Sequence, residues 1–156
     1  MKNKLEKIER NMNLAIIEAY KALDIDEVPI GAVILKDNKI IGKGYNQTEN
    51  LKDPTAHAEI IAITSAVNTL GDWRLNDCEI YITKEPCPMC AGAIINARIK
   101  SVYFGAYDEK EGCCGSLYQI CNDPRFKHRS TVSGGFLNYE CEQLLKSFFK
   151  LKRNKK

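Results

Sequence analysis

The spacing of apolar residues changes along the chain, and these changes constrain the fold most strongly. Apolar side chains recur every three or four positions over residues 5–23, which predicts an amphipathic helix. These side chains are Leu5, Ile8, Met12, Ala15, Ile16, Ala19, Tyr20 and Leu23. Two apolar runs follow, 30–35 and 40–45, with turn-forming residues between them, so they predict an antiparallel hairpin. A polar loop is expected over residues 46–55.

Beyond this loop, predicted helices and strands alternate. We expect helices over residues 56–70, from Pro88 to about 97, at 117–121 and over 137–153, and strands at 79–83, 101–105 and 131–133. A hairpin followed by such alternation is typical of a mixed sheet with helices on both faces. The sequence therefore predicts an α/β fold.

The length and composition suit one domain. The chain has 156 residues, of which 44% are hydrophobic, enough to build a core without disulfide bonds. We predict a single domain over residues 1–151 and a basic tail over 152–156. The charged N-terminus contains no apolar run suited to a signal peptide or a membrane span, so we expect a cytoplasmic protein without a membrane partner.

Cysteine and charge patterns narrow the function. Seven cysteines make an odd number and follow no export signal, which favours reduced thiols and metal ligation over a disulfide framework. The net charge of +3 is too small to indicate nucleic-acid binding. Its distribution is more informative, because basic residues crowd the last eleven positions: Lys146, Lys150, Lys152, Arg153, Lys155 and Lys156.

Two short segments supply metal ligands. His57-Ala58-Glu59 offers an imidazole and a carboxylate, and Cys87-Pro88-Met89-Cys90 offers two thiols at the start of a predicted helix. Zinc binds nitrogen and sulfur ligands tetrahedrally, and a catalytic zinc keeps three protein ligands and one open position. A structural zinc would need a fourth ligand, and Cys113, Cys114 and Cys121 lack the spacing of a second ligand pair. Glu59 beside an open position suits proton transfer in a hydrolytic reaction.

Together with the segments around them, these motifs resemble the bacterial tRNA-specific adenosine deaminase family, within the cytidine deaminase-like superfamily. The resemblance runs from about Glu27 to Arg153. It is carried by residues 27–33, 53–59, 85–93, 104–106, 115–117, 122–126 and 148–149. It implies a three-layer α/β/α fold with a mixed five-stranded sheet, and one zinc ion (Zn2+) per subunit held by His57, Cys87 and Cys90.

The resemblance also implies the reaction and its partners. Adenosine at the wobble position of a tRNA anticodon stem-loop would become inosine and release ammonia, with zinc activating the water that attacks C6 and Glu59 moving the protons. A homodimer is implied as well. The implied substrate-binding residues are Asn46, Ala58, Lys84, Pro86, Asp108, Lys110, Phe148, Phe149 and Arg153. Without the resemblance, Asn46 reads more simply as a turn residue at a strand end. Of the two phenylalanines, we expect one to be buried.

Lys84 departs from the family pattern, which usually has an apolar residue at this position. A lysine here changes the polarity of the pocket or reaches a phosphate. Two other functions remain open on the motifs alone. One is a deaminase of a free base or nucleoside, such as guanine or cytosine, which would share the zinc centre. The other is a zinc-stabilised RNA-binding module, which would not need Glu59.

Overall fold

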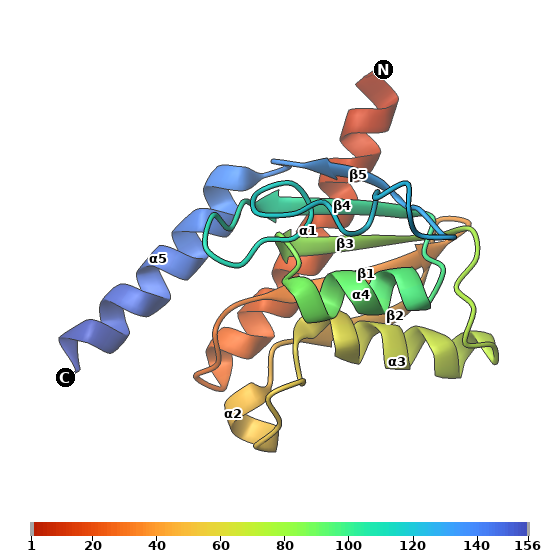
Figure 1. Ribbon diagram of the computed structural model, residues 1–156. Helices are drawn as coiled ribbons and strands as arrows, with labels where there is room; N and C mark the ends of the chain where they lie inside the picture. The colour runs from red at the N-terminus through yellow and green to blue at the C-terminus, as the bar shows by residue number, and fades with distance from the viewer. Residues whose placement is uncertain (1, 156) are drawn as a thin grey trace.

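The computed structural model describes residues 2–155, which form one mixed sheet with helices on both of its faces (Figure 1). The strands are β1 (Gly31–Lys36), β2 (Lys39–Tyr45), β3 (Cys78–Lys84), β4 (Ser101–Ala106) and β5 (Thr131–Gly134). Their order is β2-β1-β3-β4-β5. β1 is antiparallel to both of its neighbours, while β3, β4 and β5 run parallel.

Four long helices cover the sheet and a one-turn helix lies in a loop. They are α1 (Lys2–Asp24), α2 (Thr48–Leu51), α3 (Ala58–Leu70), α4 (Pro88–Asn96) and α5 (Asn138–Asn154). α3 and α4 pack on one face, and α1 and α5 on the other (Figure 1). The predicted three-layer α/β/α fold with a five-stranded mixed sheet is confirmed.

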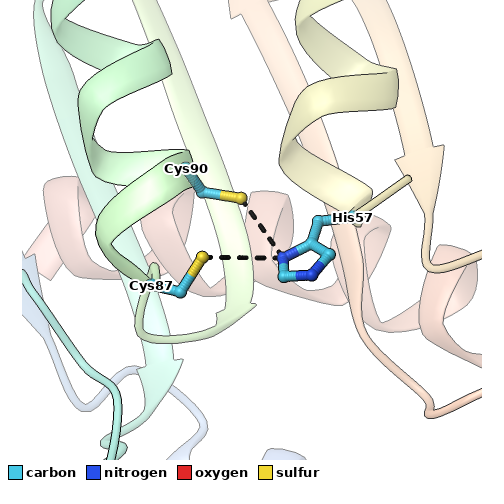
Figure 2. A group of neighbouring side chains, drawn as sticks. All are labelled: His57, Cys87 and Cys90. Carbon is cyan, nitrogen blue, oxygen red and sulfur yellow. Dashed lines mark hydrogen bonds between the residues drawn. The ribbon is translucent and has the colours of Figure 1, made fainter. Parts of the chain in front are cut away.

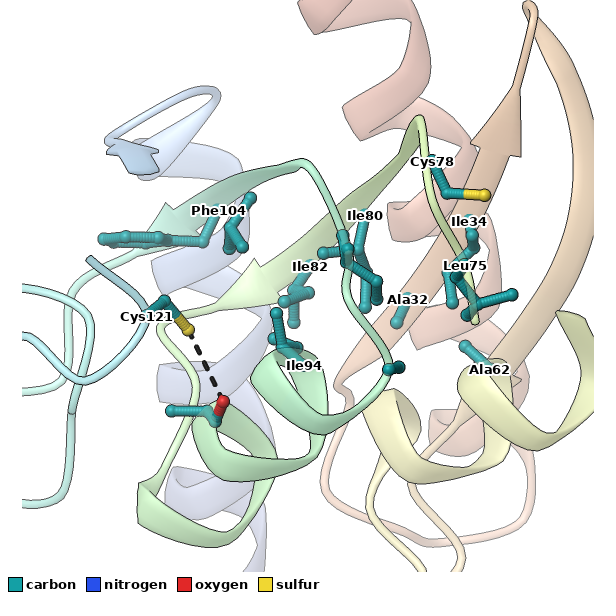
Figure 3. Close-up of a cluster of buried hydrophobic side chains, with 14 of the residues drawn as sticks. Ala32, Ile34, Ala62, Leu75, Cys78, Ile80, Ile82, Ile94, Phe104 and Cys121 are labelled. Atoms are coloured by element: carbon teal, nitrogen blue, oxygen red, sulfur yellow. Dashed lines mark hydrogen bonds between the residues drawn. The ribbon is translucent and has the colours of Figure 1, made fainter. Parts of the chain in front are cut away.

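The central strands are buried on both faces, so their side chains divide between two apolar clusters. Ile80 and Ile82 of β3 face α3 and α4, where Ile94 packs against them (Figure 3). Tyr81 lies between them in sequence and points to the opposite face, where it belongs to the same apolar cluster as Met12 of α1. This period of two follows from the pleat of a strand. Burial on both faces holds β3 at the centre of the molecule, and its C-terminal end leads into the cysteine segment.

Close packing fixes α3 against β2. A Cβ atom added to Gly44 would lie 2.4 Å from the carbonyl oxygen of Ala58, and one added to Gly42 would lie 2.5 Å from that of Ala62. Neither position has room for a side chain, because the backbones of the helix and the strand nearly touch. The small residues therefore determine where the N-terminal end of α3 lies, and with it the position of His57.

Several sequence predictions need correction. His57 is the N-cap of α3, outside its first turn, and the predicted polar loop 46–55 contains α2. Leu5 and Tyr20 are exposed, although they match the helical stripe of α1. The final helix continues to Asn154, beyond the boundary drawn at residue 151.

The helix predicted at 117–121 is wrong. The segment folds as a tight loop, with Gly115 at φ 140° and an isolated bridge between Cys114 and Gln119. Inside the loop, Cys114 Sγ lies 3.4 Å from Cys121 Sγ. A helical pattern of apolar residues could not anticipate these contacts, because the backbone N–H groups of Leu117 and Ile120 bond Gly112 and Cys113 instead of continuing a helix.

Among the described residues, all seven cysteines are free of disulfide bonds. Within residues 2–155, none of the helices combines the length and the apolar character that crossing a membrane requires.

Candidate active site

The three predicted metal ligands meet where α3 and α4 begin (Figure 2). His57 is the N-cap of α3 and Cys87 the N-cap of α4, both with extended backbone, and Cys90 lies one turn further into α4. Pro88 occupies the first turn of α4, where its missing N–H costs no hydrogen bond. Two helix N-termini thus carry the whole group.

The side chains already have the arrangement of a metal site. Nδ1 of His57 lies 3.6 Å from Sγ of Cys87 and 3.5 Å from Sγ of Cys90, and the three atoms lie within 4.8 Å of one another. Cys90 is buried, while His57 and Cys87 are half-buried. One imidazole nitrogen and two sulfurs converging on one point suit zinc. The group contains no fourth histidine, cysteine or carboxylate from the described part of the chain, so one coordination position is left open.

The two thiols differ in acidity. A hydrogen bond with Cys90 lowers the pKa of Cys87 to about 4, against the opposing effect of burial, and His57 lowers it further. The neighbouring Cys87 and burial both raise the pKa of Cys90. The hydrogen bond with Cys87 also raises the pKa of His57. Since the thiolate is the form that ligates metals, Cys87 is prepared for binding in the folded protein.

Glu59 lies in the first turn of α3, two residues after His57, and is only 4% exposed. Burial raises the pKa of its carboxyl group above the usual value. A raised pKa makes the carboxylate a stronger base, so it takes up a proton more readily than an exposed glutamate does. Glu59 therefore has the position, and a direction of pKa shift, that suit a proton carrier.

A cavity of about 230 Å³ opens beside these residues. Its size is below the range of about 300–1,000 Å³ that is usual for drug-sized ligands, and suits a single base. It is lined by Val28, Ile30, Asn46, Thr48, His57, Ala58, Glu59, Lys84, Glu85, Cys87, Asp108, Glu111 and Phe149.

The cavity brings together five of the predicted substrate-binding residues: Asn46, Ala58, Lys84, Asp108 and Phe149. Lys110 and Arg153 line a groove that adjoins the cavity. Pro86 is buried and lines neither, and its carbonyl oxygen accepts a hydrogen bond from the backbone N–H of Cys113. Phe148 is also buried, at 6% exposure, whereas Phe149 is 43% exposed. The expectation that one phenylalanine would be buried is confirmed, and the geometry argues against Phe148 as a substrate contact.

Glu27, which sequence reasoning did not single out, supports Asn46. Its side chain is 2% exposed. Its Oε2 accepts a hydrogen bond from Nδ2 of Asn46 at 3.3 Å, and its Oε1 accepts one from the backbone N–H of Asn50 at 2.6 Å. The carboxylate thus orients the Asn46 amide at the cavity wall. Nothing in the local sequence indicates this contact, because it joins the segment after α1 to the end of β2.

Glu85 is the second residue that sequence reasoning missed. It is 3% exposed and accepts hydrogen bonds from the backbone N–H groups of Asp108, Cys114 and Ser116, at 3.0, 3.1 and 2.9 Å, and from the Ser116 hydroxyl at 2.5 Å. A Cβ atom on Gly112 would lie 2.3 Å from its carboxyl carbon. The loop 108–116, which we call the rim loop, is folded around this one carboxylate.

Lys84 and Asp108 form an ion pair at the mouth of the cavity, with Nζ and Oδ2 3.0 Å apart. Burial alone would raise the pKa of Asp108. Lys84 and the backbone N–H groups of Lys110 and Glu111 outweigh that effect, so its pKa lies below the usual value. Asp108 is therefore ionised and held in place at neutral pH.

A three-layer α/β/α fold with an open His/Cys/Cys site and a buried glutamate defines a hydrolytic deaminase. Residues 6–153 match the family of MafB19-like deaminases. The chain is also 45% identical to the tRNA-specific adenosine deaminase of Bacillus subtilis (strain 168), over 95% of its own length and 92% of the relative's. The chain therefore belongs to the tRNA-specific adenosine deaminase family.

Two solved structures of deaminases are similar to this chain. A structure from a study of A-to-I editing by tRNA:A34 deaminases at the wobble position of transfer RNA has a TM-score of 0.83 and 43% identity, over 87% of this chain and 99% of that chain. Guanine deaminase from Bacillus subtilis has 44% identity and a TM-score of 0.61, over 64% of each chain. The first match extends over more of this chain than the second.

Proposed function

We propose that this protein is a zinc-dependent enzyme that deaminates adenosine to inosine at the wobble position of a tRNA anticodon loop and releases ammonia. The similarity over nearly the whole chain to a tRNA-specific adenosine deaminase carries the proposal. The convergent ligands, the buried Glu59 and the cavity that suits one base support it.

His57, Cys87 and Cys90 would hold the zinc, which supplies the Lewis acidity that makes water a nucleophile near neutral pH. Glu59 takes the proton from the attacking water and delivers it to N1 of the purine. It then helps to protonate the departing amine. Both transfers need a carboxyl group that is shielded from solvent, and Glu59 is 4% exposed.

Residues that line the cavity would bind the base. The backbone N–H of Ala58 is in the first turn of α3, where helix N–H groups lack a partner within the helix, so it can donate to the new oxygen on C6. Asn46, oriented by Glu27, can hydrogen-bond the purine. A base in this cavity has left its stack, which favours a nucleotide in a loop over one in a duplex.

The adjoining groove favours an RNA substrate over a free base. It is lined by Lys84, Asp108, Lys110, Glu111, Leu145, Lys146, Phe149 and Arg153. Four of these residues are cations and two are carboxylates, a balance that favours a phosphate backbone. Phe149 lines both the cavity and the groove and offers a surface for stacking. We also propose that the protein forms a homodimer and is cytoplasmic, since both properties suit an enzyme that acts on tRNA.

Substitution of Glu59 tests the mechanism. We expect Glu59→Ala and the isosteric Glu59→Gln to lower kcat by about a thousandfold while zinc content and fold stay intact. Glu18 offers a matched control, since it is 3% exposed but lies in α1 on the opposite face of the sheet. Glu18→Gln should retain normal kcat wherever it folds. Normal activity in Glu59→Gln would disprove the proton-carrier role.

The substrate is tested by direct comparison. The purified protein is incubated with an anticodon stem-loop carrying adenosine at the wobble position and, separately, with free guanine, cytosine and adenosine. We expect inosine in the RNA and no ammonia from the free compounds. Ammonia from guanine or cytosine alone would make the protein a free-base deaminase.

A further inference from the structure

Lys84 is unusual for its position in the fold. It ends β3, the central strand, whose preceding residues Ile80 to Thr83 are buried. Its side chain reaches the mouth of the cavity and retains 26% exposure. Lys84 lines both the cavity and the adjoining groove. An ammonium group at this junction lies at the exit from the base site.

The ion pair with Asp108 leaves some of the N–H donors of the Lys84 ammonium group free. Oδ1 of Asp108 accepts hydrogen bonds from the backbone N–H groups of Lys110 and Glu111, at 3.1 and 3.2 Å, so the rim loop itself fixes this carboxylate. Its other oxygen faces Lys84. Because an ammonium group carries three N–H donors, two remain for another acceptor.

The path from the cavity into the groove indicates what that acceptor is. The two spaces share Lys84, Asp108, Glu111 and Phe149, so a strand whose base enters the cavity continues directly into the groove. Beyond Lys84, the groove presents Lys110, Lys146 and Arg153. A nucleotide chain has a phosphate on each side of the buried base, and a phosphate oxygen accepts strong charge-assisted hydrogen bonds from an ammonium group.

We propose that Lys84 binds a phosphate oxygen of the RNA strand next to the target adenosine, and thereby makes the enzyme prefer adenosine within RNA over the free nucleoside. The inference rests on the proposed function. Asp108 acts as the support that holds the ammonium group at the cavity mouth before RNA arrives. Such a fixed charge loses little conformational entropy on binding.

The decisive experiment measures the salt dependence of Lys84→Met and Lys84→Arg. With the stem-loop as substrate, we expect Lys84→Met to raise KM about tenfold and to leave kcat within about twofold. The slope of log(kcat/KM) against log salt concentration should become less negative by about 0.7, as expected for one lost phosphate contact on a single strand. Lys84→Arg should restore the slope, because it keeps the charge.

Lys36→Met is the matched control. Lys36 also ends a central strand, but it pairs with Cys78 at the opposite end of the sheet. This substitution should change neither KM nor the salt slope. Lower kcat in Lys84→Met with an unchanged slope would show that Lys84 only supports the rim loop and would overturn the inference.

Equilibrium binding of the stem-loop, measured by fluorescence anisotropy across a salt series, separates this inference from the proposed function. If the wild-type protein binds the RNA but does not deaminate it, the proposed function is wrong. The Kd slopes of wild type and Lys84→Met then still decide the role of Lys84. Equal slopes would refute it, and a difference of about 0.7 would support it.

Discussion

The candidate metal centre, formed by His57, Cys87 and Cys90, and the rim loop both line one cavity but are held by different forces. His57 and Cys87 start helices that pack on the sheet, and the close approach of Gly44 to Ala58 leaves no space for a side chain between strand and helix. Cys113 and Cys114 of the rim loop pack in the apolar cluster, but the rest of the loop is held through polar groups. Its shape depends on the buried carboxylate of Glu85 and on the ion pair of Asp108.

This difference separates the chemistry from the choice of substrate. Close packing fixes atoms to within fractions of an ångström, as the reacting groups require. Polar contacts at a cavity mouth can change without disturbing the core. We therefore expect substitutions at the metal centre to abolish the reaction, and substitutions at the rim to change affinity and stability more gradually.

The largest effect is expected from Cys90→Ser. The buried thiol is one of only three converging ligands, so its loss should remove bound zinc and abolish deamination. Zinc content by atomic absorption and ammonia release measure the two effects. Binding of the stem-loop should remain within about threefold of wild type, since the groove is unchanged. Stoichiometric zinc in an active Cys90→Ser protein would contradict the assigned ligand set.

An intermediate effect is expected from Glu85→Gln. The amide offers a single acceptor oxygen where three backbone N–H groups and a hydroxyl now converge on two. We expect a loss of about 2 kcal/mol in the free energy of unfolding, and kcat/KM for the stem-loop lower by about tenfold. Urea titration and steady-state kinetics give both values, and zinc content should not change.

The control for this substitution is Glu79→Gln, on the same strand. Glu79 lies near the opposite end of β3, where it accepts a hydrogen bond from Tyr81 and pairs with Lys7. The Glu79→Gln substitution should leave kcat/KM for the stem-loop unchanged. Equal kinetic losses in the two variants would mean that Glu85 acts through the strand and not through the rim loop.

The smallest effect is expected from Asp108→Asn, and it depends on pH. The pKa of Asp108 is lower in the folded protein, so its charge stabilises the fold above the unfolded pKa of about 4. That contribution is lost as pH falls through the folded value. At pH 7 we expect Asp108→Asn to lose about 1 kcal/mol in the free energy of unfolding. The difference from wild type should shrink steadily below pH 4.

Asp72→Asn provides the comparison for that series. Asp72 also pairs with a cation, Arg74, but about half of each side chain is exposed, at 49% and 52%. Water screens such a pair, so its removal should leave the unfolding curve unchanged at every pH. A pH-independent loss in Asp108→Asn would show that the charge of Asp108 contributes nothing to stability.

Local pattern predicted most of the fold. The spacing of the apolar residues predicted the four long helices and the five strands of the described chain to within a few residues. A helix or strand that buries one face repeats its apolar residues with the period of that element, and a strand buried on both faces is a continuous apolar run. The helix predicted at 117–121 is wrong because Leu117 and Ile120 donate their backbone N–H groups to Gly112 and Cys113, in a loop whose preceding residues Cys114 and Ser116 are held by Glu85. Non-helical backbone bonds of this kind leave no periodic signal in the sequence of the loop.

The sequence by itself determined the chemistry of the centre. The proposed zinc ligands and proton carrier, His57, Cys87, Cys90 and Glu59, are rare residue types at fixed spacings, so they could be predicted without coordinates. Only the tertiary structure showed that Glu27 orients Asn46, that Lys84 pairs with Asp108, and that Phe149 rather than Phe148 faces the cavity. Such contacts join residues distant in sequence, and they form only when the chain packs around its sheet.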